Sequence, residues 1–152
     1  MSEAIVTVDI GGTHARFAIA EVAGGRVQSL GDATTLHTKD HASFQTAWED
    51  FAQRQGGLPR SVAIAIAGPT RGDIIRFTNN PWIIRPALIG EKLNVDRHVL
   101  VNDFEAVGHA VAQADASYFE RLTGPDEPLP ATGTITIIGP GTGLGVAHIW
   151  RN

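Results

Sequence analysis

The stretch "VTVDIGGTHARFAIA" (residues 6–20) decides the fold. β-branched and apolar residues lead into Gly11-Gly12-Thr13, and a second apolar run follows, which predicts two strands joined by a tight glycine turn. The stretch "ITIIGPGTGLGVAHI" (residues 135–149) has the same pattern and aligns with the first without a gap. Four identities fall at matched positions: Thr7 with Thr136, Gly12 with Gly141, Thr13 with Thr142, and Ala18 with Ala147. We interpret the two stretches as an internal repeat; the alternative is two unrelated β-hairpins that share glycine and threonine.

Glycine turns of this kind suit phosphate binding. Consecutive glycines permit φ > 0 and allow the backbone to approach a ligand closely. Their N–H groups can converge on a phosphate, to which a threonine hydroxyl adds a donor. Two such turns facing each other would clamp a polyphosphate. The closing hairpin then looks like the first element of a second lobe, so we expect the chain to be a fragment.

Composition limits the classes of protein to which this chain can belong. Of the 152 residues, 43% are hydrophobic and 18% are charged, which is typical of a globular chain. A net charge of -4 argues against non-specific nucleic-acid binding. The absence of cysteine excludes disulfides and thiolate sites, and the six histidines show no metal-ligand spacing. No signal peptide and no apolar run of about 20 residues is present, so we expect a cytoplasmic protein without a membrane partner.

The order of predicted elements indicates an α/β fold. Three strands (4–10, 15–22 and 26–36) form a meander, and alternating helices and strands follow (helices 42–55, 84–93 and 104–114, strands 61–68 and 97–101). This order predicts a mixed five-stranded sheet with helices on both faces, followed by the first hairpin of a second lobe. We expect an N-terminal lobe at 1–122, a Pro/Gly-rich linker at 123–133, and the truncated second lobe at 134–152.

Two aspartates, Asp9 and Asp103, lie at the carboxyl ends of predicted strands, where sheets of this kind bind ligands. Asn102-Asp103 could hold a substrate hydroxyl from two sides, the carboxylate accepting its proton and the amide orienting it, as phosphoryl transfer to an alcohol requires. Asp9 would suit an outer-sphere role toward Mg²⁺. The structural alternatives are a helix N-cap for Asp103 and turn capping for Asp9.

The segment "FTNNPW" (residues 77–82) places Thr78, Asn79 and Asn80 between aromatic residues. Hydrogen-bonding side chains beside an aromatic ring suit a sugar. The alternative is a turn built from asparagine and proline.

Five segments together resemble the bacterial glucokinase family, within the sugar kinase, actin and Hsp70 superfamily: "VDIGGTHAR", "AIAGP", "TNNPW", "VNDFEAVGHA" and "IGPGTGLGVAHI". They occur in the family's order and at its spacing over nearly the whole chain. The resemblance implies a ribonuclease H-like (actin-like ATPase) lobe. It also implies ATP-dependent phosphorylation of glucose to glucose 6-phosphate, the first step of glycolysis, with Mg²⁺.

The resemblance also implies roles by motif position. Asp103 would be the catalytic base, and Asn102, Asp103, Asn79 and Thr78 would bind the sugar. The residues implied for ATP phosphates are Asp9, Ile10, Gly11, Gly12, Thr13, Gly141, Thr142 and Gly143. Asp9 would contact the metal through water.

The chain departs from the family in length, since family members are about twice as long and carry further sugar and adenosine contacts after the second turn. We therefore expect this polypeptide alone to phosphorylate glucose feebly or not at all. The open alternatives are a non-catalytic sugar-binding regulator, another hexose kinase, and an actin-like or Hsp70-like ATPase. Glucose is the expected partner, and a homodimer is left open.

Overall fold

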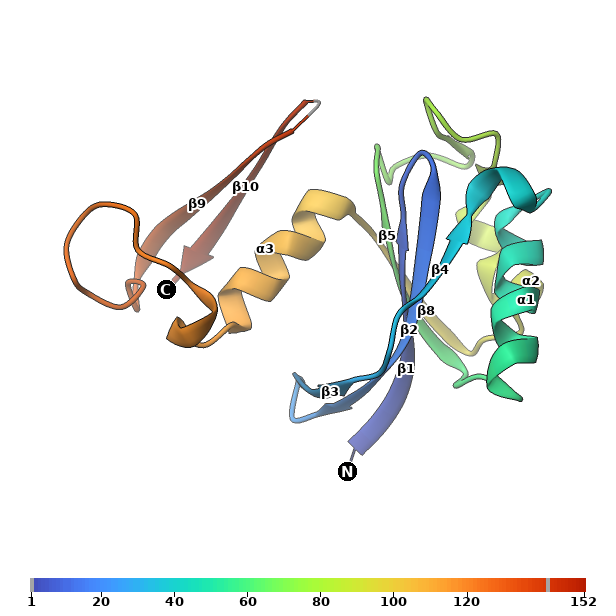
Figure 1. Cartoon of the computed structure of the whole chain (residues 1–152), viewed down its shortest axis with the longest axis horizontal. Coiled ribbons are helices and arrows are strands. Elements are labelled where there is room, and N and C mark those ends of the chain that lie inside the picture. Colours follow the sequence, from blue (N-terminus) through green and yellow to red (C-terminus); the bar gives the residue numbers. More distant parts are fainter. Residues whose placement is uncertain (1, 142) are drawn as a thin grey trace. The chain divides into compact units, whose positions relative to one another are not determined.

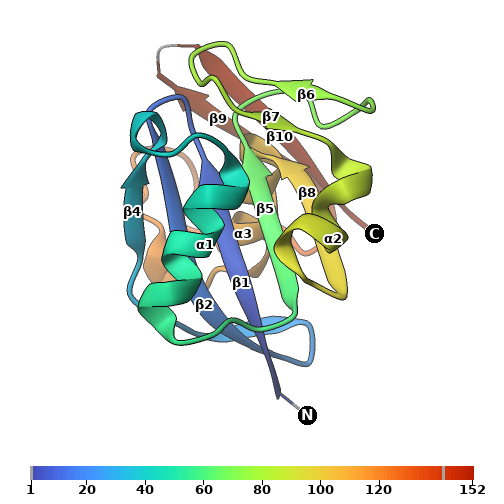
Figure 2. The same cartoon turned by 90° about the vertical axis from the view of Figure 1, so that its right-hand side faces the viewer.

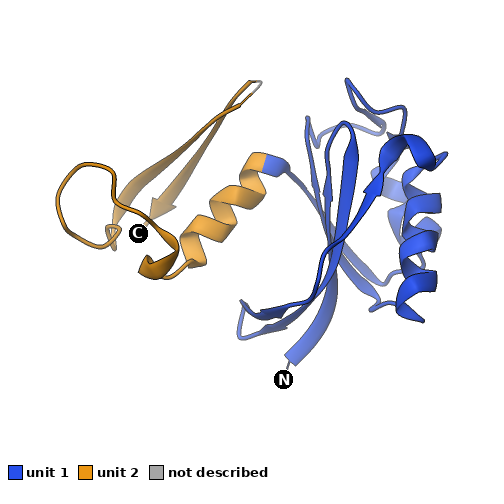
Figure 3. Ribbon diagram, in the orientation of Figure 1, with its two compact units in different colours: residues 1–103 blue, residues 104–152 orange. Residues whose placement is uncertain are grey.

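The computed structural model describes residues 2–141 and 143–152. The chain divides into two compact units, which Figure 3 shows in different colours. Unit 1 ends at Asp103, and unit 2 begins at Phe104.

Unit 1 is built around one mixed sheet, whose strands are labelled in Figure 1. The spatial order is β3-β2-β1-β5-β8, and β4 also pairs with β2. β1 is antiparallel to β2 and parallel to β5, which in turn is parallel to β8. The strands are β1 (Ser2–Ile10), β2 (His14–Ala23), β3 (Arg26–Leu30), β4 (Thr34–His37), β5 (Ser61–Ile66) and β8 (Arg97–Asn102). The predicted meander followed by parallel strands is confirmed.

The third predicted strand, residues 26–36, is divided into β3 and β4. Both pair with β2, β3 near its carboxyl end and β4 near its amino end. Between them the N–H of Gly31 donates to the carbonyl of Ile19 at 2.9 Å. The sheet therefore has six strands where the sequence predicted five.

Two helices of unit 1, α1 (Phe44–Gln55) and α2 (Ile89–Leu93), cover the same face of the sheet (Figure 2). α1 begins with a capping box, in which Ser43 and Thr46 each accept the other's backbone N–H, and it ends at Gly56 in the left-handed conformation. The predicted apolar face of α1 is buried: Phe44, Ala47, Trp48 and Phe51. Its rings pack on Phe17 of β2, with ring centroids of Phe17 and Phe51 5.2 Å apart.

The second predicted helix, residues 84–93, is shorter than expected. Ile84 belongs to β7 (Ile83–Ile84), which pairs with β6 (Ile75–Arg76). Pro86 begins a 3₁₀ turn, η2 (Pro86–Leu88), before α2. A further 3₁₀ turn, η1 (Thr38–Asp40), follows β4. No helix in the described residues is both long and apolar enough to cross a membrane.

Unit 2 packs one helix on one hairpin. Helix α3 (Asp103–Gln113) has its first residue in unit 1 and the rest in unit 2, and η3 (Ala116–Tyr118) follows it. The predicted closing hairpin is present as β9 (Gly133–Pro140) and β10 (Leu144–Arg151). One hairpin face contacts α3, since a Cβ added to Gly108 would lie 3.6 Å from the Ala147 Cβ. The domain division predicted from the sequence, with a linker at 123–133, stays a prediction.

Contacts of Asp50, in the middle of α1, join this helix to His41 in the segment before it. Asp50 accepts hydrogen bonds from Arg54 at 2.7 Å and from His41 at 3.0 Å. The Arg54 guanidinium, and to a smaller degree His41, lowers the pKa of the Asp50 carboxyl. Because this pKa is lower in the folded than in the unfolded chain, the ionised carboxylate stabilises the fold above the ordinary aspartate range. That stability is lost as the pH falls through the folded pKa.

We expect Asp50→Asn to lower the free energy of unfolding by less than about 1 kcal/mol near neutral pH, since the group lies close to the surface. The difference from wild type should shrink as the pH falls below the ordinary aspartate range, because protonation of the wild-type carboxyl removes its charge. Urea titrations over a series of pH values from neutral into acid measure this difference. The exposed Asp40→Asn variant is the control, and a difference that persists unchanged in acid would contradict the assignment.

Candidate active site

The carboxyl ends of three parallel strands meet at one edge of the unit 1 sheet (Figure 1). Ile10 of β1 pairs with Ile66 of β5, and Ile66 pairs with Asn102 of β8, so the three residues form one row across the sheet. The Gly11-Gly12 turn and Asn102-Asp103 therefore leave the sheet at the same level. The structure thus brings together, within unit 1, the first predicted phosphate turn and the predicted catalytic carboxylate.

The first glycine turn is held through its carbonyl groups. Asn80 Nδ2 donates to the Gly11 carbonyl at 3.1 Å, and Thr38 Oγ1 donates to the Gly12 carbonyl at 3.0 Å. The Thr38 N–H donates to the Thr13 carbonyl at 2.9 Å. The N–H groups of Gly12 and Thr13, by contrast, donate to no group in the described part of the chain. With its carbonyls bound to the protein, the turn has N–H donors left for an anion.

The reason for glycine in this turn differs from the predicted one. Neither Gly11 nor Gly12 has a positive φ, so the expected left-handed conformation is wrong for both. Close approach explains Gly12: a Cβ there would lie 3.1 Å from the Asn79 Cβ, which is tighter than nine in ten real Cβ contacts. A side chain at residue 12 would push the 77–82 segment away from the turn.

Asp9 lies directly opposite Arg16 in the β1–β2 pairing. Arg16 donates to Asp9 Oδ2 at 3.0 Å, and about half of each side chain is exposed. Asp9 Oδ1 accepts no hydrogen bond from any described residue. The described residues also contain no group of three or more His, Asp or Glu side chains that could hold a metal directly. A single half-exposed carboxylate suits a metal held through water, as Mg²⁺ commonly is.

The 77–82 segment is attached to the glycine turn by Asn80, which the sequence groups with Thr78 and Asn79 in a sugar-binding segment or an asparagine turn. Asn80 is 6% exposed. Its Nδ2 donates to Gly11, and its Oδ1 accepts the Trp82 N–H at 2.9 Å. Trp82 is buried and donates its Nε1–H to the His41 carbonyl at 2.9 Å. Thr78 and Asn79, the predicted sugar ligands, are exposed. Two adjacent asparagines thus differ in role, one structural and one open to a ligand.

Asn102 and Asp103 are both half-buried at the end of β8. Asn102 Nδ2 donates to the Gly68 carbonyl at 3.1 Å, which fixes the orientation of the amide. Helix α3 begins at Asp103, directly after Asn102 at the end of β8. The catalytic role of Asp103 and its alternative as a helix cap both stay predictions.

The second glycine turn joins β9 to β10 in unit 2. The Gly141 N–H donates to the Gly143 carbonyl at 2.9 Å, and Thr142 lies outside the described residues. Because the two predicted phosphate turns belong to different units, their joint clamp on a polyphosphate stays a prediction.

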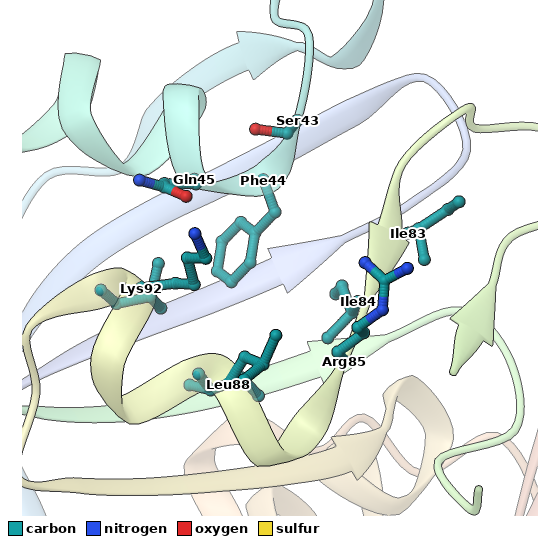
Figure 4. Close-up of a pocket in the computed structure, with 10 residues that line it drawn as sticks. Ser43, Phe44, Gln45, Ile83, Ile84, Arg85, Leu88 and Lys92 are labelled. Atoms are coloured by element: carbon teal, nitrogen blue, oxygen red, sulfur yellow. The ribbon is translucent and has the colours of Figure 1, made fainter. Parts of the chain in front are cut away.

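A separate pocket of about 200 Å³ lies between α1 and the 83–93 segment (Figure 4). Apolar side chains such as Phe44 and Ile84 line it, together with Arg85 and Lys92. None of the predicted site residues in the described ranges lines this pocket. It is therefore distinct from the site at the strand ends.

Known proteins that resemble this chain include several glucokinases. The glucokinase family matches residues 6–152. A glucokinase of Zymomonas mobilis is 62% identical over 148 residues, which cover 97% of this chain and 46% of that protein. A glucokinase structure from an Antarctic psychrotroph matches with a TM-score of 0.85 at 25% identity, covering 98% of this chain and 47% of its own. A glucokinase from Balamuthia mandrillaris in complex with glucose matches with a TM-score of 0.73 at 21% identity, over 99% and 45% of the two chains.

The chain spans about half the length of the relatives it matches. The likeness to the two structures confirms the predicted actin-like fold class. The family match extends over nearly every residue and includes both glycine turns and the Asn102-Asp103 pair. The chain therefore belongs to the glucokinase family.

Proposed function

We propose that this chain forms the part of a glucokinase that binds glucose and begins the ATP site. The complete enzyme transfers the γ-phosphoryl group of ATP to the 6-hydroxyl of glucose. Family membership supports this function, and the glucose complex of the Balamuthia mandrillaris relative supports glucose as the sugar. A cytoplasmic location, where ATP is available, is part of the proposal.

One observation carries the proposal: the first glycine turn and Asn102-Asp103 leave the ends of β1 and β8, the two strands that flank β5, in a single row. The turn offers two backbone N–H donors, and the pair on the other side of β5 offers a carboxylate and an oriented amide. A phosphate donor and a hydroxyl acceptor therefore have recognition groups at one sheet edge. This combination is what transfer of a phosphoryl group to an alcohol requires.

Asp103 is the proposed general base. Its carboxylate accepts the proton of the 6-hydroxyl as the hydroxyl oxygen attacks, a contribution that is typically 10²- to 10⁴-fold in rate. Asn102, held by Gly68, hydrogen-bonds the sugar and fixes the hydroxyl for attack. Thr78 and Asn79 extend the sugar site from the neighbouring segment.

The proposed ATP ligands lie in the segments from Asp9 to Thr13 and from Gly141 to Gly143. In the first segment the N–H groups of Gly12 and Thr13 would bind phosphate, because the Gly11 N–H already donates to the His14 carbonyl at 2.9 Å. Mg²⁺, when bound with ATP, neutralises the charge of the phosphates. Asp9 would orient a water molecule of the metal through Oδ1, while Arg16 holds Oδ2.

We expect Asp103→Asn to lower kcat for glucose by about 10²-fold or more, since an amide cannot accept the proton. The assay couples ADP release to a hexose panel with Mg-ATP. The test protein, called here the extended enzyme, is this chain joined to the remaining carboxyl-terminal part of the Zymomonas mobilis glucokinase. Asp115→Asn, an exposed carboxylate beyond the other end of α3, should keep the wild-type rate.

The 152-residue chain alone should turn over glucose feebly or not at all, and a robust rate would contradict that expectation. An extended enzyme that binds glucose without releasing ADP would favour the sugar-binding regulator. An active extended enzyme that prefers a different sugar would favour another hexose kinase.

Asn79 and Asn80 make a matched pair of variants. Asn80→Ala removes the partners of the Gly11 carbonyl and the Trp82 N–H, and should lower the free energy of unfolding by about 1–3 kcal/mol. Asn79→Ala, at an exposed position, should leave stability nearly unchanged and raise KM for glucose in the extended enzyme. Urea titration measures the stability of each variant, and the ADP-release assay measures its KM for glucose. Equal losses of stability would contradict the assignment of structural and ligand roles.

Self-association of the 152-residue chain has support from one surface of unit 2. The hairpin face opposite α3 exposes Ile138 (61%), Val146 (47%) and Trp150 (75%). Apolar patches of this kind favour association. We expect the 152-residue chain to self-associate in sedimentation experiments and Val146→Lys to shift it toward monomer. A wild-type chain that stays monomeric would refute this expectation.

A further inference from the structure

We infer that Phe104 is a positioning residue for the second glycine turn. Its ring fixes to helix α3 the end of the β9–β10 hairpin that carries Gly141 and Gly143. The same helix begins with Asp103, the proposed base. The kinetic consequence of this inference rests on the proposed function, but the packing it describes does not.

The ring lies against a pair of glycines. Gly139 and Gly145 are directly opposite each other in the hairpin, one pair before Pro140 and Leu144, which flank the turn. A Cβ at Gly139 would lie 2.5 Å from Phe104 Cε2, and a Cβ at Gly145 would lie 2.4 Å from the same atom. Real Cβ atoms do not come so close to carbon. The ring therefore occupies the space that side chains at both positions would need.

Gly139 and Gly145 destabilise the hairpin, and the Phe104 ring offsets this effect. Glycine in a strand interior weakens the strand, because it has more conformational freedom to lose and no side chain to pack. An aromatic ring laid over such glycines shields their backbone and restores the missing packing. Without Phe104, the last strand pairs before the turn would lack side-chain cover on this face.

The helix and the hairpin match in spacing along this contact. Phe104 lies over Gly139 and Gly145, and Gly108, four residues on, lies over Ile137 and Ala147, two residues along each strand. Four helical residues advance about 6 Å and two strand residues about 6.7 Å, so the contacts stay in step.

Arg151 fixes the far end of the contact. Its guanidinium donates to the carbonyl of Ala112 in the last turn of α3 at 3.1 Å and to the carbonyl of Pro130 at 3.0 Å. The hairpin is thus bound to α3 at both ends, by a cation beside the chain terminus and by the Phe104 ring beside the glycine turn. Of these two anchors, the ring is the one adjacent in sequence to Asp103.

A double-mutant cycle tests the packing in the 152-residue chain. Phe104→Ala and Gly145→Ala should each lower hydrogen-exchange protection of the amides flanking the turn by about tenfold or more, the first by removing the ring and the second by displacing it. In the double variant the new methyl group has room, so protection should return to within about threefold of wild type. Gly108→Ala is the matched control, because its Cβ would make only an ordinary contact at 3.6 Å and should lower no protection.

Kinetics of the extended enzyme test the positioning role. Phe104→Ala should raise KM for ATP about tenfold, while KM for glucose stays within about threefold, since the proposed sugar ligands lie in unit 1. Partial unfolding of the variant, by contrast, would lower kcat and would not raise KM for ATP alone. Adding Gly145→Ala to Phe104→Ala should recover part of the loss.

Additive effects in the exchange cycle would overturn the inference. If the effects on hydrogen exchange are non-additive but KM for ATP is unchanged, the positioning role is refuted, and Phe104 makes a packing contact only. If the wild-type extended enzyme shows no kinase activity, the proposed function fails, and the exchange cycle by itself decides whether Phe104 holds the turn.

Discussion

The pairing register of β1, β5 and β8 is the constraint on which the site depends. Alternate residues of β1 and β5, such as Val8 and Ile64, are buried under α1. A shift of one residue in the strand pairing would therefore move these apolar side chains to the opposite face of the sheet. Burial of apolar side chains therefore fixes the register. The register in turn fixes the level at which the Gly11-Gly12 turn and Asn102-Asp103 leave the sheet.

The sequence predicts those parts of the fold that depend on local patterns. The spacing of Phe44, Trp48 and Phe51 predicts α1 and its buried face correctly, because helical periodicity is a property of neighbouring residues. The division of residues 26–36 into two strands depends instead on contacts of Gly31 and β4 with β2. The packing of α3 on the hairpin likewise joins segments that the predicted linker separates, and no local pattern signals it.

At the site, sequence motifs predict which types of residue are present. Tertiary contacts decide which residue of a motif supports the fold and which is left open to a ligand. The segment "TNNPW" indicates an asparagine site, but only the fold shows that Asn80 faces the glycine turn while Asn79 stays exposed. Thr38 holds the carbonyls of Gly12 and Thr13, yet it lies 26 residues from Gly12 and outside every motif. The sequence correctly predicts a turn at Gly11-Gly12. The reason for glycine at residue 12, however, is its close approach to Asn79 and not a left-handed backbone.

The placement of the three tryptophans gives the chain its own spectroscopic probes. Trp48 and Trp82 are 5% and 1% exposed and both lie in unit 1, whereas Trp150 is 75% exposed and lies in unit 2. Iodide in the solvent would quench the emission of Trp150 and leave the blue-shifted emission of the buried pair. Trp82, which hydrogen-bonds to Asn80 within the 77–82 segment and to the His41 carbonyl before α1, would report on that region without any added label. The two units can therefore be followed separately by fluorescence in one unmodified sample.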